Sequence, residues 1–239
     1  MSTTISFAKH SRIGKRKNNE DAAEIALRPN SALLVVADGL GGHSGGEIAS
    51  QTLVDTIVKC FKEATNDQLK NQKTFFPYAV AEAHRAIHRA AKEAGKVEFD
   101  PKTTCVIAMI YGNDINWCHV GDSRMYLVRD NMIAFHTTDH VAKGFKKNAP
   151  INRCVGGAEP PKATLNEPLR LEDGDMIFLC TDGAWHKLTL PDLVTIDYKN
   201  PQSGLEDLLE VIEGRNNAPS DNITAIAACF GNKKPDLRR

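Results

Sequence analysis

The sequence lacks several features that would assign it to a broad functional class. Its 30 basic and 30 acidic residues cancel, so no overall field attracts nucleic acid or a membrane surface. No apolar run reaches membrane-spanning length, the N-terminus has no signal-peptide core, and no internal repeat occurs. We therefore expect a soluble, cytoplasmic and monomeric protein that binds neither nucleic acid nor membrane.

Clustered cysteines are also absent. The six cysteines are scattered, and no two lie within four positions of each other. This spacing excludes a zinc knuckle and a redox pair, and it favours buried, reduced thiols.

The length of 239 residues fits one domain. We expect it to cover residues 1–232, followed by a basic tail at 233–239. Apolar periodicity predicts helices over 45–64, 76–94, 191–197 and 204–213, and strands over 3–9, 33–37, 103–111, 115–120, 124–128, 132–135, 163–171, 176–180 and 223–230.

The links between the middle strands are too short for crossover helices, so these strands form an antiparallel meander. The order of strands, helices, strands, helices and a last strand predicts an α+β fold. We expect a four-layer α/β/β/α sandwich, in which helices flank two antiparallel β-sheets.

One stretch, 33–47, has the strongest local signal. An apolar run ends in a lone carboxylate, Asp38, and five glycines follow within eight residues. This pattern predicts a buried strand that delivers one carboxylate to a tight turn, where the backbone approaches a ligand closely. A cation, or a phosphate held through a cation, fits this pattern better than an apolar ligand.

Other acidic residues also adjoin apolar strands. They are Glu20 and Asp21, Asp122, Asp182 and Asp221. Any one of them is explained as an ordinary turn residue. Together, carboxylates at one end of a sandwich would repel one another unless cations lay among them, and such oxygen ligands suit Mg²⁺ or Mn²⁺.

Six short motifs, taken in order, resemble those of the metal-dependent type 2C (PPM) serine/threonine protein phosphatases. They are Arg16-Lys-Asn-Asn-Glu-Asp21, Val36-Ala-Asp-Gly-Leu-Gly-Gly-His43, Gly121-Asp-Ser-Arg124, Thr138-Asp-His140, Cys180-Thr-Asp-Gly183 and Ser220-Asp-Asn222. The resemblance runs over nearly the whole chain. It implies a sandwich of two antiparallel sheets with a two-metal centre at one end, which agrees with the predicted architecture.

The resemblance also implies roles for individual residues. Asp38 would bridge two metal ions, the Gly39 carbonyl would bind the first, and Asp182 and Asp221 would bind the second. Glu20 and Asp21 would act through metal-bound waters, and Arg16 would grip the substrate phosphate with a bidentate fork. Hydroxide bridging the metals would then attack the phosphorus of phosphoserine or phosphothreonine on protein substrates that a kinase has modified.

Three departures from the family pattern stand out. Leu40 replaces a histidine that eukaryotic members carry, which indicates the bacterial type and leaves protonation of the leaving group to water. His186 replaces an aspartate that would share a third ion with Asp122. Asp122 would therefore hold that ion weakly or not at all, and an imidazole ligand there would favour Mn²⁺ over Mg²⁺. The flap over the substrate channel, about 141–156, is shortened, which should expose the site or alter substrate choice.

Rival interpretations remain. Gly42-His-Ser-Gly-Gly46 matches the nucleophile elbow of serine hydrolases, but Ser44 lies too far from the strand, and no histidine follows His186. A pseudophosphatase that keeps the fold as a binding module is the other alternative.

Two further pairs of residues favour structural roles. His84 and His88 lie four positions apart, as the zinc-binding histidines of a zinc protease do, yet the basic residues around them favour a solvated face. Trp117 and Trp185 are expected to pack, with Trp185 also able to rim the site.

Overall fold

The computed structural model describes residues 4–40, 45–95, 97–144, 149–194, 196–197, 200–215 and 221–231. It places the apolar run in β3 (Ser31–Leu40), an inner strand of the larger sheet. Leu33 and Val35 pack toward the helices, whereas Leu34 and Val36 pack toward the other sheet. Because both faces are buried, the strand reads as a continuous apolar run rather than an alternating one.

Two antiparallel sheets form the centre of the molecule. The first has the order β1 (Ile5–Arg12), β12 (Ile223–Phe230), β11 (Met176–Cys180), β7 (Arg124–Arg129) and β8 (Met132–His136). The second has the order β10 (Leu169–Arg170), β6 (Asp114–Val120), β5 (Cys105–Tyr111), β3 and β2 (Asp21–Arg28), with β4 (Lys102–Thr103) on β3 and β9 (Thr164–Leu165) on β6. Their facing sides share one apolar core.

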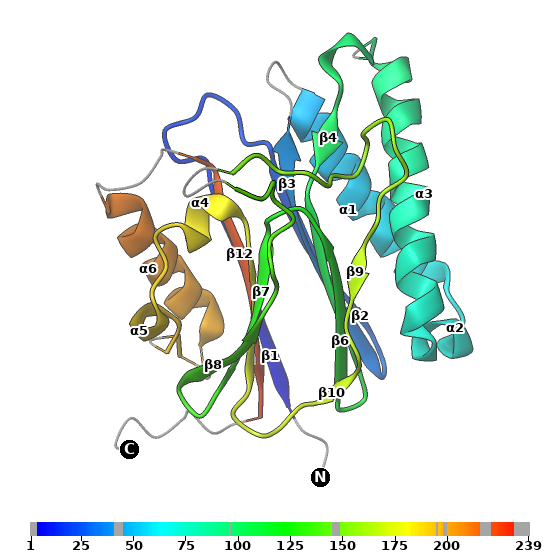
Figure 1. The fold of residues 1–239 in the computed structure, drawn as a ribbon. Coiled ribbons are helices and arrows are strands. Elements are labelled where there is room, and N and C mark those ends of the chain that lie inside the picture. The colour runs from blue at the N-terminus through cyan, green and yellow to red at the C-terminus, as the bar shows by residue number, and fades with distance from the viewer. Residues whose placement is uncertain are drawn as a thin grey trace.

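Helices cover both outer faces of this sandwich (Figure 1). The second sheet is covered by α1 (Gly45–Glu63) and α3 (Gln72–Glu93), with α2 (Asn66–Lys70) between them and the short η1 (Val97–Phe99) after them. The first sheet is covered by α4 (Asp182–Trp185), α5 (Leu190–Leu193) and α6 (Pro201–Gly214). The predicted α+β fold of four layers is confirmed.

Some local predictions were incomplete. Strand β2 was not predicted, because its sequence, DAAEIALR, is rich in residues that are depleted in strands. The strand predicted over 163–171 is reduced to β9 and β10, and the helix over 191–197 to the four residues of α5. The tail at 233–239 lies outside the described residues.

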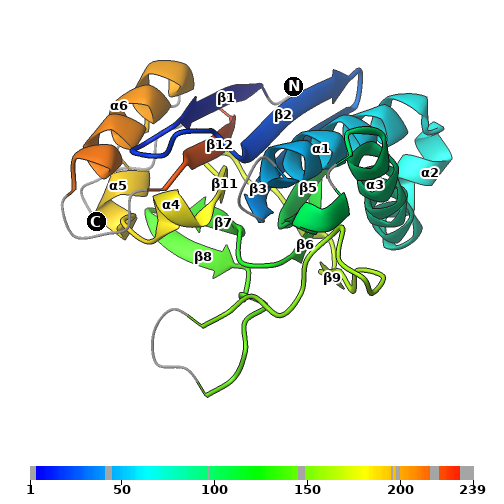
Figure 2. The ribbon, with the colours of Figure 1, turned by 90° about the horizontal axis from the view of Figure 1, so that it is seen from above.

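The segment between β8 and β9 leaves the sandwich and returns to it, as Figure 2 shows from above. In its described residues it has no strand, only isolated bridges from Val141 to Ile151 and from Val155 to Thr103. This agrees with the sequence pattern, which predicts no helix or strand between residues 135 and 163. No helix of the described residues is long and apolar enough to cross a membrane.

Candidate active site

Ends of strands from both sheets bring the predicted acidic residues together. Asp21 begins β2 and lies opposite Asp38 in the register with β3. Asp182 directly follows Thr181 at the end of β11, and Asp221 precedes β12, the strand beside β11. The sandwich therefore gathers, at one end, carboxylates that lie far apart in the sequence.

The main chain of Asp38 is fixed by two threonines. Its N–H donates to Thr104 Oγ1 at 2.9 Å, and its carbonyl accepts from Thr104 N at 2.8 Å and from Thr103 Oγ1 at 2.9 Å. Thr104 Oγ1 also bonds Ser123 Oγ at 2.7 Å, in the turn that carries Asp122. Both threonines are fully buried, so Asp38 is held independently of its carboxylate.

Gly39 lies where a side chain has no room. A Cβ there would be 2.4 Å from the carbonyl carbon and oxygen of Gly46, and 2.6 Å from Glu20 O. The Gly39 N–H donates to this Glu20 carbonyl at 3.0 Å. Glycine is therefore required for the first turn of α1 to approach the end of β3.

Gly39→Ala should lower the free energy of unfolding by about 1–3 kcal/mol, because the atoms that the methyl group meets are backbone atoms that move only with the helix. Urea denaturation measures the loss. Gly214→Ala is the matched control, since a Cβ at Gly214 meets nothing within 4 Å. Equal stability of the two variants would show that α1 and β3 are not tightly apposed.

Asp182 and Asp221 meet where α4 begins. A Cβ on Gly183 would lie 2.1 Å from Asn222 O and 3.1 Å from Asp221 Cβ, so the two segments touch through this glycine. Asn222 ties the arrangement to the N-terminal loop, because its Oδ1 accepts from Glu20 N at 2.9 Å and its Nδ2 donates to Ile13 O and Asn18 O. Asp21 is held from the other sheet by Thr181 Oγ1 at 2.9 Å.

Burial, and then the charges of neighbouring carboxylates, raises the pKa of the acidic side chains in the cluster. Burial, reinforced by the charges of Asp182 and Asp221, raises the pKa of Asp21 to about 7. Burial and the charge of Asp182 likewise raise the pKa of Asp122 to about 7. Burial followed by the charge of Asp21 raises the pKa of Asp38 well above the usual range of a carboxyl. The protein alone does not neutralise this cluster.

The donor atoms fit hard divalent cations. Oδ1 of Asp122 and Oδ1 of Asp182 are buried and, among the described residues, have no hydrogen-bond partner. Unpartnered buried carboxylate oxygens are costly unless a cation or water satisfies them. Within the described ranges, no group of three or more His, Cys, Asp or Glu side chains is arranged so that it could hold a metal ion by itself. An ion here would therefore complete its shell with main-chain carbonyls and water, as Mg²⁺ commonly does.

Arg16 and His186 both adjoin the cluster. Arg16 Nη2 donates to Asp221 Oδ2 at 2.7 Å, and its side chain is 53% exposed. His186 Nδ1 lies 3.8 Å from Asp182 Oδ2, and its ring packs against Trp185. Arg16 thus stands at the open side of the cluster, while the nearest carboxylate recorded for His186 is Asp182.

Several supporting residues were not predicted as part of the site. They are Thr103, Thr104, Ser123, Thr181 and Asn222. Their signal in the sequence is weak: they are polar residues at the ends of apolar strands, and they bond main chain, carboxylates or another hydroxyl 19 to 209 positions away.

Contrary to the prediction, His84 does not lie on a fully solvated face. Its Nδ1 accepts from Gly156 N at 3.2 Å, which fastens the end of the excursion to α3. Ser44, the serine of the hydrolase alternative, lies outside the described residues.

The Protein phosphatase 2C family model matches residues 9–211, a span that includes every predicted site residue except Asp221. The chain belongs to the protein phosphatase 2C family. This confirms the resemblance drawn from the six motifs. The family is metal-dependent, in keeping with the unsatisfied carboxylates.

Relatives in bacteria support the same assignment. The chain is 30% identical over 189 residues to the serine/threonine protein phosphatase PstP of Mycobacterium tuberculosis, covering 70% of this chain and 34% of that protein. It therefore spans about a third of the length of this relative. It is 26% identical over 230 residues to the protein phosphatase PhpP of Streptococcus pneumoniae, covering 88% of this chain and 91% of that protein.

A solved structure agrees with the fold. The catalytic domain of PstP in complex with two manganese ions has a TM-score of 0.76 and 26% identity, covering 96% of this chain and 99% of that chain. Membership of the bacterial type, inferred from Leu40, is confirmed by these relatives.

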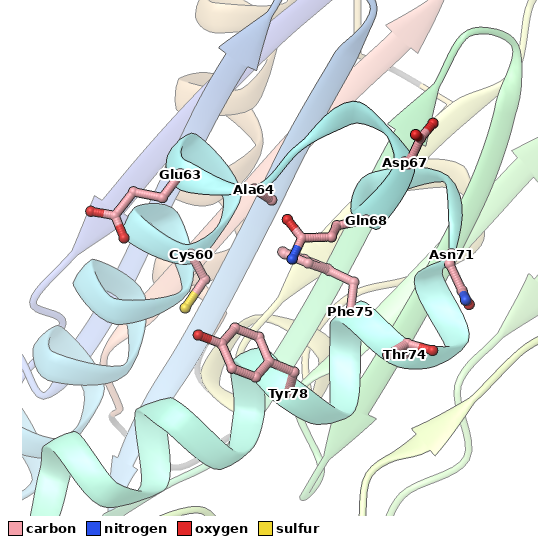
Figure 3. A pocket seen from close by; sticks show the side chains of 9 residues that line it. All are labelled: Cys60, Glu63, Ala64, Asp67, Gln68, Asn71, Thr74, Phe75 and Tyr78. Atoms are coloured by element: carbon pink, nitrogen blue, oxygen red, sulfur yellow. The ribbon is translucent and has the colours of Figure 1, made fainter.

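A separate cavity of about 510 Å³ lies between α1, α2 and α3 (Figure 3). Its lining includes Cys60, Gln68, Phe75 and Tyr78, with the Tyr78 ring directed toward Cys60. None of the predicted site residues lines it, so this cavity does not belong to the carboxylate cluster.

Proposed function

We propose that the protein hydrolyses phosphoserine and phosphothreonine on proteins in a metal-dependent reaction. The observation that carries this proposal is the cluster of Asp21, Asp38, Asp122 and Asp182, whose raised pKa values and unpartnered oxygens call for cations. Family membership supplies the class of reaction. Substrates would be phosphoproteins made by a serine/threonine kinase.

Asp38, Asp182, Asp221 and the Gly39 carbonyl would hold two ions, with Glu20 and Asp21 acting through water. Bound Mg²⁺ or Mn²⁺ would supply a Lewis acid and lower the pKa of water enough for hydroxide to be available near neutral pH. The residues of the chain then serve to orient this assembly. Thr103 and Thr104 hold Asp38 by its main chain, which leaves its carboxylate free to bind.

A third ion would bind at Asp122, with His186 as its second side-chain ligand. Asp122 has an unpartnered oxygen that suits an ion. His186 approaches Asp182, and an imidazole ligand there would favour Mn²⁺ over Mg²⁺. Calorimetric titration of His186→Ala with Mn²⁺ shows whether His186 binds the third ion. If the variant loses a weak Mn²⁺ site, His186 is a ligand of that ion.

Arg16→Ala should raise KM for a phosphothreonine peptide about tenfold or more, while Mn²⁺ affinity changes little. Arg16 is exposed, close to Asp221, and offers the bidentate geometry that phosphate recognition uses. Steady-state kinetics and Mn²⁺ calorimetry measure the two effects. Lys17→Ala, in the same loop, is the control, and loss of metal binding in Arg16→Ala would overturn the assigned role.

Hydrolysis of p-nitrophenyl phosphate and a phosphothreonine peptide tests the proposal itself. Mn²⁺-dependent activity that EDTA abolishes supports it. Activity that survives EDTA but is lost to a serine-directed fluorophosphonate would favour a hydrolase that uses Ser44. Mn²⁺ binding without activity would identify a pseudophosphatase.

A further inference from the structure

The third motif and the fourth, Gly121-Asp-Ser-Arg124 and Thr138-Asp-His140, meet beside the carboxylate cluster. The main chains of Gly121 and His140 are joined by a 2.9 Å bond from His140 N to Gly121 O. His140 stands at the start of the excursion between β8 and β9, and it has no part in the ligand set described above. Its contacts nevertheless lead directly to Asp122.

The His140 ring is bonded at both nitrogens. Nδ1 lies 3.1 Å from Gly121 N, and Nε2 lies 2.8 Å from Thr164 Oγ1. An amide N–H can only donate, so Nδ1 is the acceptor and Nε2 carries the proton. The ring also stacks on that of His119, with centroids 4.3 Å apart and planes inclined by 14°.

His140 is neutral under ordinary conditions, as this geometry requires. Burial, together with nearby His119 and Arg153, lowers the pKa of His140 to about 4. His119 is itself 4% exposed and bonds Thr138 O through Nε2 at 2.8 Å. The stacked rings of His119 and His140 are therefore held in place, and the Gly121 amide is bonded to the ring of His140.

Gly121 needs such support because its backbone is unusual. Its φ is +99°, and a Cβ would lie 2.7 Å from Thr104 Cγ2, so it is pressed between Thr104 and His140. On the far side, the Asp122 carbonyl accepts from Trp185 Nε1 at 2.9 Å. The Asp122 side chain is 8% exposed, with an unpartnered Oδ1, so the direction of its carboxylate depends on how this turn is held.

We infer that His140 is a positioning residue: by accepting the Gly121 N–H at Nδ1, it holds the Asp122 carboxylate toward the cluster. The consequence for catalysis rests on the proposed function, whereas the consequence for the turn and for ion binding does not. Direct contact of His140 with substrate is not part of the inference.

Two variants at position 140 distinguish the effect of the hydrogen bond from the effect of packing alone. In His140→Asn, the side-chain oxygen can take the place of Nδ1, whereas His140→Leu keeps bulk but offers no acceptor. His136→Leu, at the exposed end of β8, controls for loss of an imidazole elsewhere. Thermal unfolding of all three variants shows whether each is folded.

In His140→Leu, the Gly121 amide should exchange with solvent about tenfold faster, and the Mn²⁺ concentration for half-maximal activity should rise about tenfold, as for loss of other outer partners of metal ligands. KM for the phosphothreonine peptide should not change. His140→Asn should stay within about threefold of wild type on each measure, and His136→Leu should match wild type.

Amide exchange and Mn²⁺ calorimetry do not need an active enzyme, so they test the inference even if the proposed reaction is absent. Equal exchange of Gly121 in wild type and His140→Leu would overturn it. Equal impairment of the Asn and Leu variants would also overturn it, because packing on His119 would then be the whole role. In wild type, nitrogen NMR showing the proton on Nδ1 would contradict the assigned bond directly.

Discussion

Asp38→Asn should reduce metal-dependent phosphatase activity by at least about 100-fold, beyond the 10–100-fold that loss of an outer partner costs. Asp38 is buried, and the charges of four other carboxylates, Asp21, Asp182, Asp122 and Asp221, add to the effect of burial in raising its pKa. An amide keeps the shape but removes the charge that attracts cations. The turnover number in saturating Mn²⁺, with p-nitrophenyl phosphate as substrate, measures the loss.

The same variant should fold well. Thr103 and Thr104 bond only the main chain of Asp38, so their hydrogen bonds survive the substitution. Replacing a carboxyl whose ionisation is opposed by burial and by neighbouring charges should also raise the melting temperature in EDTA. Asp55→Asn, on the exposed face of α1, is the control for the loss of one carboxylate. An Asp38→Asn variant that is folded and fully active would remove Asp38 from the metal centre.

Strand β3, which carries Asp38, could be predicted because its signal is local. A continuous apolar run that ends in a carboxylate specifies a buried strand without reference to the rest of the chain; the strand runs on to Leu40, and the turn predicted after it lies outside the described residues. The short helix α4 was not predicted, since its four residues are too few to show helical periodicity. Strand β2 depends on pairing with β3, which outweighs the weak strand preference of its alanines and glutamate.

The supporting contacts could not be predicted for a related reason. The bond from Thr104 to Asp38 joins residues 66 positions apart, and the bond from Thr181 to Asp21 spans 160 positions. Pairing of β4 and β5 with β3 brings Thr104 to Asp38, and packing of the two sheets brings Thr181 to Asp21. The motifs could thus indicate the carboxylates of the site, whereas the hydrogen bonds that orient them follow from the tertiary structure.

The metal-free protein should lose stability as pH rises from about 4 to about 7. Folding raises the pKa of Asp21 and of Asp122 from 3.8 to about 7, so the native state binds more protons than the unfolded state in this window. The free energy of unfolding then falls with pH, and the stabilising contribution is fully present only below the unfolded pKa. For Asp122 alone, the shift corresponds to about 4 kcal/mol as an upper bound.

Urea denaturation in EDTA at several pH values measures this slope, and Asp122→Asn should make it shallower because position 122 no longer titrates. At pH 8 in EDTA the variant should be more stable than the wild type. Adding Mn²⁺ should reverse that order, since an ion that binds only the native state stabilises it by mass action and the wild type keeps more ligands. Stability in EDTA that rises from pH 4 to 7, or a slope unchanged by Asp122→Asn, would mean that burial and neighbouring charges do not raise the pKa of these carboxyl groups.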